Sequence, residues 1–388
     1  MCVGVVPAVV KVGHRGRPCG RKGVTSAAVA VYAGLSVHYS RMWAHARGEH
    51  HRCERWERRK GTNMSVASTS PTSPGAVAVV GAGLIGRSWM RVFARAGFPT
   101  RVYDPDAEQL GRALAWARAS AREDVHLGLC SYSEARAEEG RITRCTTLEE
   151  ALDGVDYVQE SGPEAVATKQ SIYRELDAAA APGVVLGSST SANDMAVIAQ
   201  GLAGASRCIV AHPVNPPHVI PLVEVLEGAE TSPEVTASTL GLLRRAGMAP
   251  VLLDRFAPGF VLNRLQAALL REAISLVGTG VASPEVVDVV MREGLGLRWA
   301  LVGPFGTGHV NADGGVGSYF RMYGDAYRSV WKDLDSAPDF GEAVIDAIAR
   351  GMTATYGEGA VADLSAWRDR MVRRIMQLKV EDPPPGAD

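Results

Sequence analysis

Residues 76–86 read Ala-Val-Ala-Val-Val-Gly-Ala-Gly-Leu-Ile-Gly, and this stretch decides the fold that we expect. Its first part, Ala76–Val80, is short, apolar and rich in β-branched residues, which is typical of a strand buried on both faces. A glycine-rich turn follows, and the next residues place Ile85, Trp89 and Phe93 on one side of a helix. A buried strand that leads through glycines into a helix predicts the start of a βαβ unit.

The same alternation continues along the next 170 residues or so. Short strand candidates recur with helical patterns between most of them: Arg101–Asp104, Arg141–Thr146, Asp156–Glu160, Val184–Gly187, Cys208–Ala211, Leu222–Leu226 and Val251–Leu253. Strands that alternate with helices predict an α/β domain with a mainly parallel sheet. We place this domain at residues 76–256.

The strands stop after about residue 257, and helical patterns take over. Apolar residues recur at spacings of three and four: Leu262, Leu265, Leu269, Ala273 and Leu276. Further apolar residues widen this face beyond half of the circumference, so we expect the helix to pack on two sides. We therefore predict an all-α second domain at residues 257–380 and a short tail at 381–388.

A second helix in this region has recognisable ends. Ser283 is suited to cap its N-terminus, Pro284 to occupy its first turn, and Glu285 to lie near its positive end. Gly294 is the expected end of this helix, because glycine readily takes the conformation that terminates helices.

The first 75 residues differ in composition from the rest. Residues 1–63 hold twelve Lys and Arg against three Glu, and a Ser-, Thr- and Pro-rich linker follows Met64. We expect residues 1–75 to be a disordered extension and linker. Our hypothesis is that Met64 is the natural start, and the alternative is a native basic tail.

The overall composition excludes several function classes. The formal net charge of the whole chain is −1, which implies no general attraction to nucleic acid or to an anionic membrane. No apolar stretch is long enough to span a bilayer, and the six cysteines show no metal-like spacing. We expect a cytoplasmic protein with free thiols, no metal, no membrane partner and no nucleic-acid partner.

The glycine-rich turn predicts a dinucleotide site. Gly81 permits the tight turn, Gly83 lets the backbone approach a diphosphate, and Gly86 allows close packing of helix on strand. The N–H groups of the helix start, at Leu84 and Ile85, would then face the phosphates.

The acid that ends the second strand candidate favours one cofactor. Asp104 lies 18 residues after Gly86, where a carboxylate would bind ribose hydroxyls and repel the 2′-phosphate of NADP. We therefore expect NAD, although the nearby Arg101 would soften that repulsion.

A histidine and a glutamate suggest the chemistry. His212 ends one strand candidate and Glu224 lies in the next, so two antiparallel strands would bring them together across the sheet. Such a pair suits alcohol oxidation, because the imidazole takes the hydroxyl proton and the carboxylate stabilises the imidazolium. Without further signals, a strand-end histidine beside a buried glutamate is more often structural.

Four segments together resemble the 3-hydroxyacyl-CoA dehydrogenase family over about residues 76–380. They are His212–Pro217 with Leu222–Glu224, Ser188–Ser191, Ala257–Arg264, and Glu160–Glu164 with Lys169. The resemblance implies a Rossmann-type doubly wound sheet followed by an all-α dimerisation domain, and hence a homodimer. It also implies that the substrate is a small L-3-hydroxy compound.

The resemblance also implies roles for individual residues. His212 and Glu224 would be the acid–base pair, and Ser191 and Asn263 would complete the catalytic set by binding substrate oxygens. Asn215 is a weaker candidate for substrate binding. On the cofactor side, Glu164 and Lys169 would lie near the nicotinamide. His218, His126 and His309 are expected to be structural.

Within the family the sequence is most similar to the lambda-crystallin and L-gulonate 3-dehydrogenase branch, on the runs Ile85–Trp89, Ser188–Ser191, His212–Pro217 and Gly294–Trp299. Arg298 in the last run is suited to clamp a free carboxylate, which a thioester lacks. An ion pair of Arg298 with Glu293 is an equal alternative.

Three alternative functions remain open. The first is the same chemistry on acyl-CoA thioesters in fatty acid metabolism. The second is an NAD-binding structural protein of the crystallin type that has no turnover. The third is nucleic-acid binding through the basic N-terminus.

Overall fold

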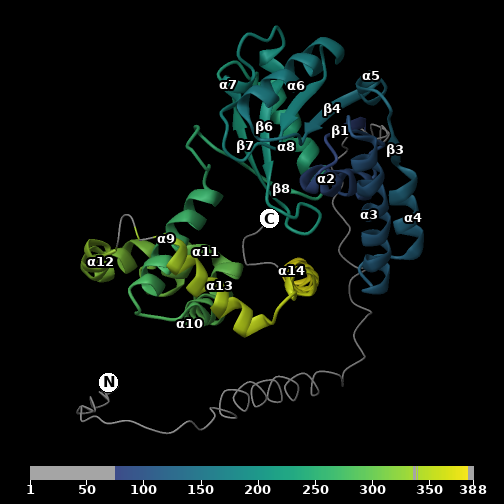
Figure 1. The fold of residues 1–388 in the computed structure, drawn as a ribbon. Coiled ribbons are helices and arrows are strands. Elements are labelled where there is room, and N and C mark those ends of the chain that lie inside the picture. The colour runs from purple at the N-terminus through teal and green to yellow at the C-terminus, as the bar shows by residue number, and fades with distance from the viewer. Residues whose placement is uncertain (1–74, 335–337, 339, 383–388) are drawn as a thin grey trace, which may run out of the picture. The chain divides into compact units, whose positions relative to one another are not determined.

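The computed structural model describes residues 75–334, 338 and 340–382, so the predictions for residues 1–74 and for the tail beyond 382 lie outside the described residues. Eight strands form one sheet (Figure 1): β1 (Ala76–Val80), β2 (Thr100–Tyr103), β3 (Ile142–Arg144), β4 (Val155–Glu160), β5 (Val185–Ser188), β6 (Cys208–Pro213), β7 (Leu222–Glu227) and β8 (Ala249–Leu252). Their order is β3-β2-β1-β4-β5-β6-β7-β8. All neighbours are parallel except β6 and β7. The predicted α/β class with a doubly wound sheet is confirmed.

Helices cover both faces of this sheet: α2 (Leu84–Arg95), α3 (Ala107–His126), α4 (Tyr132–Gly140), α5 (Leu148–Leu152), α6 (Val166–Ala179), α7 (Met195–Ile198) and α8 (Pro233–Arg245). The alternation of side chains along β1 divides the core in two. Val77 and Val79 pack with Trp89 of α2 and its neighbours α3 and α8. Ala78 and Val80 pack with the layer of α6 and α7. This two-sided burial explains why β1 is apolar at every position.

Among the described residues, six further α-helices follow the sheet domain: α9 (Leu262–Gly278), α10 (Pro284–Val290), α11 (Gly296–Val310), α12 (Gly315–Asp333), α13 (Glu342–Tyr356) and α14 (Val361–Glu381). The predicted all-α second part is therefore confirmed. The predicted cap of α10 is also confirmed, because the Ser283 side chain accepts from the backbone N–H of Val286 and Pro284 is the first residue of the helix.

The prediction that Gly294 ends a helix is wrong. The backbone continues from α10 through one π-helical turn, Met291–Leu295, directly into α11. Gly294 does not take a positive φ. It lies inside the π-helical turn, where the backbone stays helical. The real break comes later, at Gly303, whose φ of 66° is easy only for glycine.

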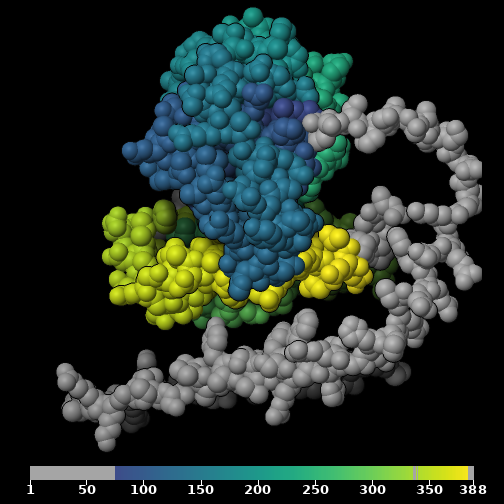
Figure 2. Space-filling view, turned by 90° about the vertical axis from the view of Figure 1, so that its right-hand side faces the viewer, coloured from purple at the N-terminus to yellow at the C-terminus, as the bar shows by residue number. Residues whose placement is uncertain are grey.

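A buried cluster of charges holds the α3–α4 hairpin. Arg91 of α2 is fully buried and pairs with Asp124 at 2.9 Å and with Glu138 at 2.6 Å. Arg373 of α14 also binds Asp124, and Figure 2 shows the blue hairpin against the yellow C-terminal helix. Arg91 is completely enclosed, and two carboxylates compensate its charge.

The helical part has little interior of its own within one chain. None of the residues of α9 is buried, and Leu265 on its apolar face is 63% exposed. The other described helices of this part, α10 to α14, bury only Val344, Thr307 and Gly308. Hence the two-sided packing expected of α9 is not made within one chain.

No described helix combines the length and apolar character needed to cross a bilayer. Among the described residues the cysteines Cys130, Cys145 and Cys208 are free thiols.

Candidate active site

The glycine-rich turn lies where the sheet changes direction, between β1 and its two neighbours β2 and β4. Gly81 has a φ of +95°, and a Cβ added there would meet the Ser161 carbonyl oxygen at 2.7 Å. Gly83 faces open space and caps α2 without any side-chain hydrogen bond. The first N–H groups of α2, at Leu84 and Ile85, therefore lack a capping side chain, which is the arrangement that suits a diphosphate.

Asp104 lies beside this turn, directly after β2. Its Oδ2 accepts the backbone N–H of Ala82 at 2.6 Å, and its Oδ1 accepts the N–H of Asp106 at 2.9 Å. The carboxylate is thereby held next to the glycine turn, where a ribose would lie. Arg101 points elsewhere, since it donates to the carbonyl of Glu150 and pairs with Asp153. The turn and this acid together fit the adenosine diphosphate half of a dinucleotide.

His212 and Glu224 face each other across the antiparallel strands β6 and β7, so the predicted meeting across the sheet is confirmed. His212 Nδ1 lies 3.0 Å from Glu224 Oε2, and both residues are buried. An ionised glutamate can only accept, so Nδ1 carries the proton in this pair. The Nε2 of a neutral His212 is then an acceptor, as a general base requires.

The start of α9 supports the glutamate from its other side. Glu224 Oε1 accepts the backbone N–H groups of Val261 and Leu262, each at 2.9 Å. These donors belong to the first turn of the helix, whose positive end stabilises a carboxylate. Phe260 has an unusual positive φ of 50° and packs its ring edge-on to His212, with the ring centroids 5.4 Å apart. The His212–Glu224 pair is thus held in place by two strands and one helix.

A cavity of about 530 Å³ opens beside this pair. Its walls bring together residues from five segments that are distant in sequence: Ile85, Ser161, Gly162, Glu164, Ser189, Ser191, His212, Pro213, Val214, Asn215, Leu262, Asn263 and Gln266. The predicted catalytic residues Ser191, His212 and Asn263 share this cavity with Ile85 of the glycine turn. Glu224 lies directly behind His212. A substrate and the nicotinamide end of a cofactor could therefore meet at the histidine.

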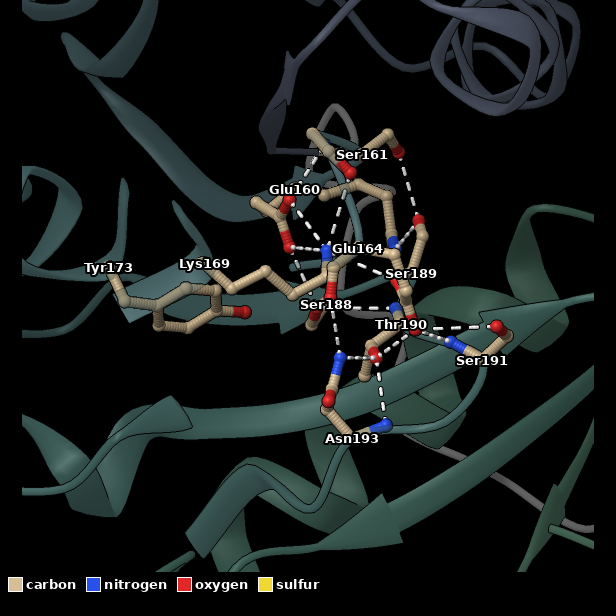
Figure 3. A network of polar contacts seen from close by, with 12 residues as sticks. Glu160, Ser161, Glu164, Lys169, Tyr173, Ser188, Ser189, Thr190, Ser191 and Asn193 are labelled. Atoms are coloured by element: carbon tan, nitrogen blue, oxygen red, sulfur yellow. Dashed lines mark hydrogen bonds and ion pairs between the residues drawn. The ribbon is translucent and has the colours of Figure 1, made fainter. Parts of the chain in front are cut away.

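Glu164 organises one wall of the cavity (Figure 3). Its Oε1 accepts from the Thr190 hydroxyl at 2.7 Å, from the Ser191 backbone N–H at 2.8 Å and from the Ala192 N–H at 3.1 Å. The Ser191 hydroxyl lies 3.3 Å from the same oxygen. Because three other donors already hold Glu164, the turn that carries Ser191 has a fixed position.

Lys169, which we expect on the nicotinamide side, is held by an ion pair with Glu160. It is 1% exposed, and its Nζ lies 3.0 Å from each oxygen of the fully buried Glu160 (Figure 3). Glu160 also accepts from the Ser188 hydroxyl at 2.7 Å and from the Gly162 N–H at 2.6 Å. Lys169 does not line the cavity itself, but its Nζ also lies 3.7 Å from Oε2 of Glu164, which does.

Arg298 is not brought to the cavity within this chain. It is an exposed residue of α11, whereas the cavity wall comes from the sheet domain and the first turns of α9. The predicted alternative partner, Glu293, pairs with Arg292 instead.

The other histidines lie apart from the acid–base pair. His218 Nδ1 lies 3.2 Å from Ser88 Oγ, and the ring packs edge-on to Trp116. Burial and four nearby arginines lower the pKa of His218 to about 2, so it stays neutral at physiological pH. His126 ends α3, and His309 of α11 accepts from the Val316 N–H. These placements agree with structural roles for all three.

The sequence interpretation missed several residues around the site, among them Gln159, Ser161, Ser189 and Phe260. Gln159, Ser161 and Ser189 flank or belong to quoted motifs, but their partners are distant in sequence. Trp89 and Ser189, for example, are 100 residues apart and share a hydrogen bond. A local pattern cannot reveal such a pair.

Two family models match the chain. Residues 76–255 match the NAD-binding domain of 3-hydroxyacyl-CoA dehydrogenase, and residues 259–351 match its C-terminal domain. Both matches agree with the strand–helix region and the helical region seen in the fold.

Individual relatives give the same result. A lambda-crystallin homolog of Bos taurus is 42% identical over 82% of this chain and all of its own length. An L-carnitine dehydrogenase of Streptomyces coelicolor is 37% identical over 80% of this chain and 96% of its own. Among solved structures, a 5-formyl-3-hydroxy-2-methylpyridine 4-carboxylic acid 5-dehydrogenase, described as NAD-dependent, has a TM-score of 0.66 and 26% identity. That match covers 78% of this chain and 97% of the other.

Proposed function

Because the chain belongs to the 3-hydroxyacyl-CoA dehydrogenase family and is an NAD-dependent oxidoreductase, we propose that it oxidises the 3-hydroxyl of a small L-3-hydroxy acid. The product would be the 3-keto acid, and an L-gulonate-like acid is the substrate that we favour. The observation that carries this proposal is the His212–Glu224 pair on the wall of a cavity that also includes Ile85 of the glycine turn.

His212 is the proton acceptor in this proposal. Its Nδ1–H donates to Glu224, so Nε2 is free to take the proton of the substrate hydroxyl. Bound NAD supplies the acceptor for the hydride that leaves the same carbon. Glu224 stabilises the imidazolium that forms, and the two N–H groups of α9 keep Glu224 from turning away.

Other residues of the cavity hold the reactants. Ser191 and Asn263 are suited to bind the substrate oxygens, and Asn215 lies on the same wall. The cofactor would be held by the glycine turn, by the first N–H groups of α2 and by Asp104. Lys169 would act on the cofactor side through its ion pairs with Glu160 and Glu164.

The choice of a free acid over a thioester rests on two observations. One relative is an L-carnitine dehydrogenase, and L-carnitine is a free 3-hydroxy acid. The second is the presence of Arg298, whose guanidinium would bind a carboxylate and would have no such partner in a thioester. Since Arg298 is exposed on α11, it would reach the cavity from a second subunit or after a movement of the helical part.

The test is a comparison of substrates with wild type and Arg298→Met. NADH formation would be followed with L-gulonate, L-3-hydroxybutyrate, L-carnitine and 3-hydroxybutyryl-CoA. We expect wild type to prefer free acids, and we expect the variant to lose that preference mainly through a higher KM, by about tenfold or more for a lost charge-assisted contact. Arg368→Met, on the exposed surface of α14, serves as the charge control.

A wild type that oxidises the thioester far better than any acid would overturn the free-acid proposal and support the acyl-CoA alternative. No turnover with any member of the panel, together with normal NADH binding, would favour the structural protein of the crystallin type.

A further inference from the structure

A line of polar side chains runs from the buried strand β4 to the cavity wall. The Tyr157 hydroxyl donates to Gln159 Oε1 at 2.7 Å, and Gln159 Nε2 donates to Ser189 Oγ at 2.8 Å. Ser189 Oγ in turn lies 2.9 Å from Ser161 Oγ, and both serines line the cavity (Figure 3). Tyr157 and Gln159 are almost completely buried, so these bonds do not compete with bulk water.

The direction of this line is fixed by its surroundings. Gln159 Nε2 also lies 3.2 Å from the carbonyl oxygen of Ala211, which can only accept. A flipped amide would set two oxygens against each other there, so Nε2 must face both Ala211 and Ser189. Burial raises the pKa of Tyr157, which keeps its proton and donates to the remaining amide oxygen.

Ser189 is consequently a saturated acceptor. It receives one hydrogen from Gln159 and a second from the indole N–H of Trp89 at 3.2 Å, and a hydroxyl oxygen accepts two. Its own hydrogen can then go only to Ser161 Oγ, because this is the remaining polar atom within reach among the described residues. Ser161 thus accepts from Ser189.

The hydrogen of the Ser161 hydroxyl is left without a partner among the described residues. Ser161 lies directly after β4 and packs against the glycine turn. Its carbonyl oxygen is the atom that a Cβ on Gly81 would strike, and its Cβ would lie 3.4 Å from one on Gly86. On the cavity side it shares the wall with His212. A donor at this point lies between the dinucleotide turn and the proton acceptor.

We propose that Ser161 Oγ donates a hydrogen bond to the carboxamide oxygen of the nicotinamide in bound NAD, and that Gln159 and Ser189 keep Ser161 in this donor state. A hydroxyl donor at this position could bind either of two oxygens, the carboxamide oxygen of the nicotinamide or an oxygen of the substrate. The experiment below distinguishes the two. The contact would fix the rotation of the nicotinamide ring relative to His212. It requires only the NAD-binding character of the domain, not the substrate proposed above.

The experiment compares ligand binding by the full chain and by Ser161→Ala, using calorimetry without substrate. NADH should bind about three- to tenfold more weakly to the variant, which is the typical loss of affinity when one hydrogen bond is removed. ADP-ribose, which lacks the nicotinamide, should bind both proteins equally and also shows that the variant is folded. Ser238→Ala, on the exposed side of α8, should leave both affinities unchanged.

A thionicotinamide analogue of NADH removes the proposed acceptor in place of the donor, because its sulfur accepts hydrogen bonds poorly. With this analogue wild type and Ser161→Ala should bind alike, so the difference between them disappears. Equal losses for NADH and ADP-ribose would mean that Ser161 only shapes the turn, and the proposal would fall. It would also fall if NADH binding stayed intact while the KM of the hydroxy substrate rose, since the donor would then serve the substrate oxygen.

Discussion

At the scale of single residues, the site depends on His212 and on the two-sided support of Glu224. The imidazole is held by the carboxylate at 3.0 Å and by the edge of Phe260. We predict that His212→Ala lowers kcat by about 10²–10⁴-fold, the usual contribution of general acid–base catalysis. NADH affinity should stay nearly unchanged, because the glycine turn lies on β1 and not on β6.

Glu224→Gln should be less damaging than His212→Ala, because the imidazole itself remains. The amide lacks the charge that stabilises the imidazolium, and its single oxygen can accept either from His212 or from the N–H groups of α9, but not from both. Steady-state kinetics and NADH titration of both variants check these expectations. His126→Ala, on α3, is the control and should behave as wild type. Collapse of NADH binding in either site variant would contradict the division of roles between proton transfer and cofactor binding.

The residue scale also separates what could be predicted from what could not. The meeting of His212 and Glu224 followed from their spacing, because two consecutive antiparallel strands pair positions at similar distances from the loop that joins them. The N–H donors from α9 were not foreseen, since Val261 and Glu224 are 37 residues apart. Contacts of that kind depend on how a helix docks, which no local pattern encodes.

At the scale of elements, the ion pair of Lys169 and Glu160 fastens α6 to the end of β4. Both side chains are at most 1% exposed. Removing one partner of a buried pair leaves an uncompensated charge, which typically costs about 3–5 kcal/mol. We therefore predict that Lys169→Met strongly lowers the urea midpoint of unfolding. Arg112→Met, which breaks exposed pairs of α3, should change stability by less than about 1 kcal/mol.

Circular dichroism during urea titration measures both variants. If Lys169→Met unfolded at the same urea concentration as wild type but bound NADH much more weakly, Lys169 would be a direct cofactor ligand. The role through Glu160 would then be wrong.

The same scale explains which element boundaries were predictable. Each predicted strand overlaps the observed one. For the central strands β1, β4, β5 and β6 the reason is burial on both faces, which leaves a nearly unbroken apolar signal. The expected stop at Gly294 failed, because glycine permits the end of a helix but does not impose one. Neighbouring turns kept the backbone helical through a π turn.

At the scale of the whole molecule, the helical part exposes an apolar surface that is typical of a protein–protein interface. We propose that a second copy of this chain covers it, as the family resemblance implied. The apolar side chains that one chain leaves exposed there include Leu265, Leu269, Leu270, Val290, Leu301, Phe305 and Trp331. Large apolar patches of this kind are rare on monomeric proteins.

The full chain should therefore behave as a dimer in light scattering at micromolar concentration. Leu265→Asp should shift it toward the monomer, because a buried unpaired charge opposes association. Tyr132→Asp, which changes an equally exposed residue on the hairpin helix α4, should remain dimeric. A compact wild-type monomer would refute the dimer.

The sequence by itself determined the fold class, the cofactor domain and the pairing of His212 with Glu224. These depend on short-range patterns: an apolar strand, glycines at fixed spacing and a histidine at a strand end. The tertiary structure decided which polar groups are already engaged. Lys169 is bound by Glu160, Arg298 lies outside the cavity, and Ser161 retains one hydrogen to donate. Hydrogen-bond capacity is limited, and its use depends on partners that only folding brings within reach.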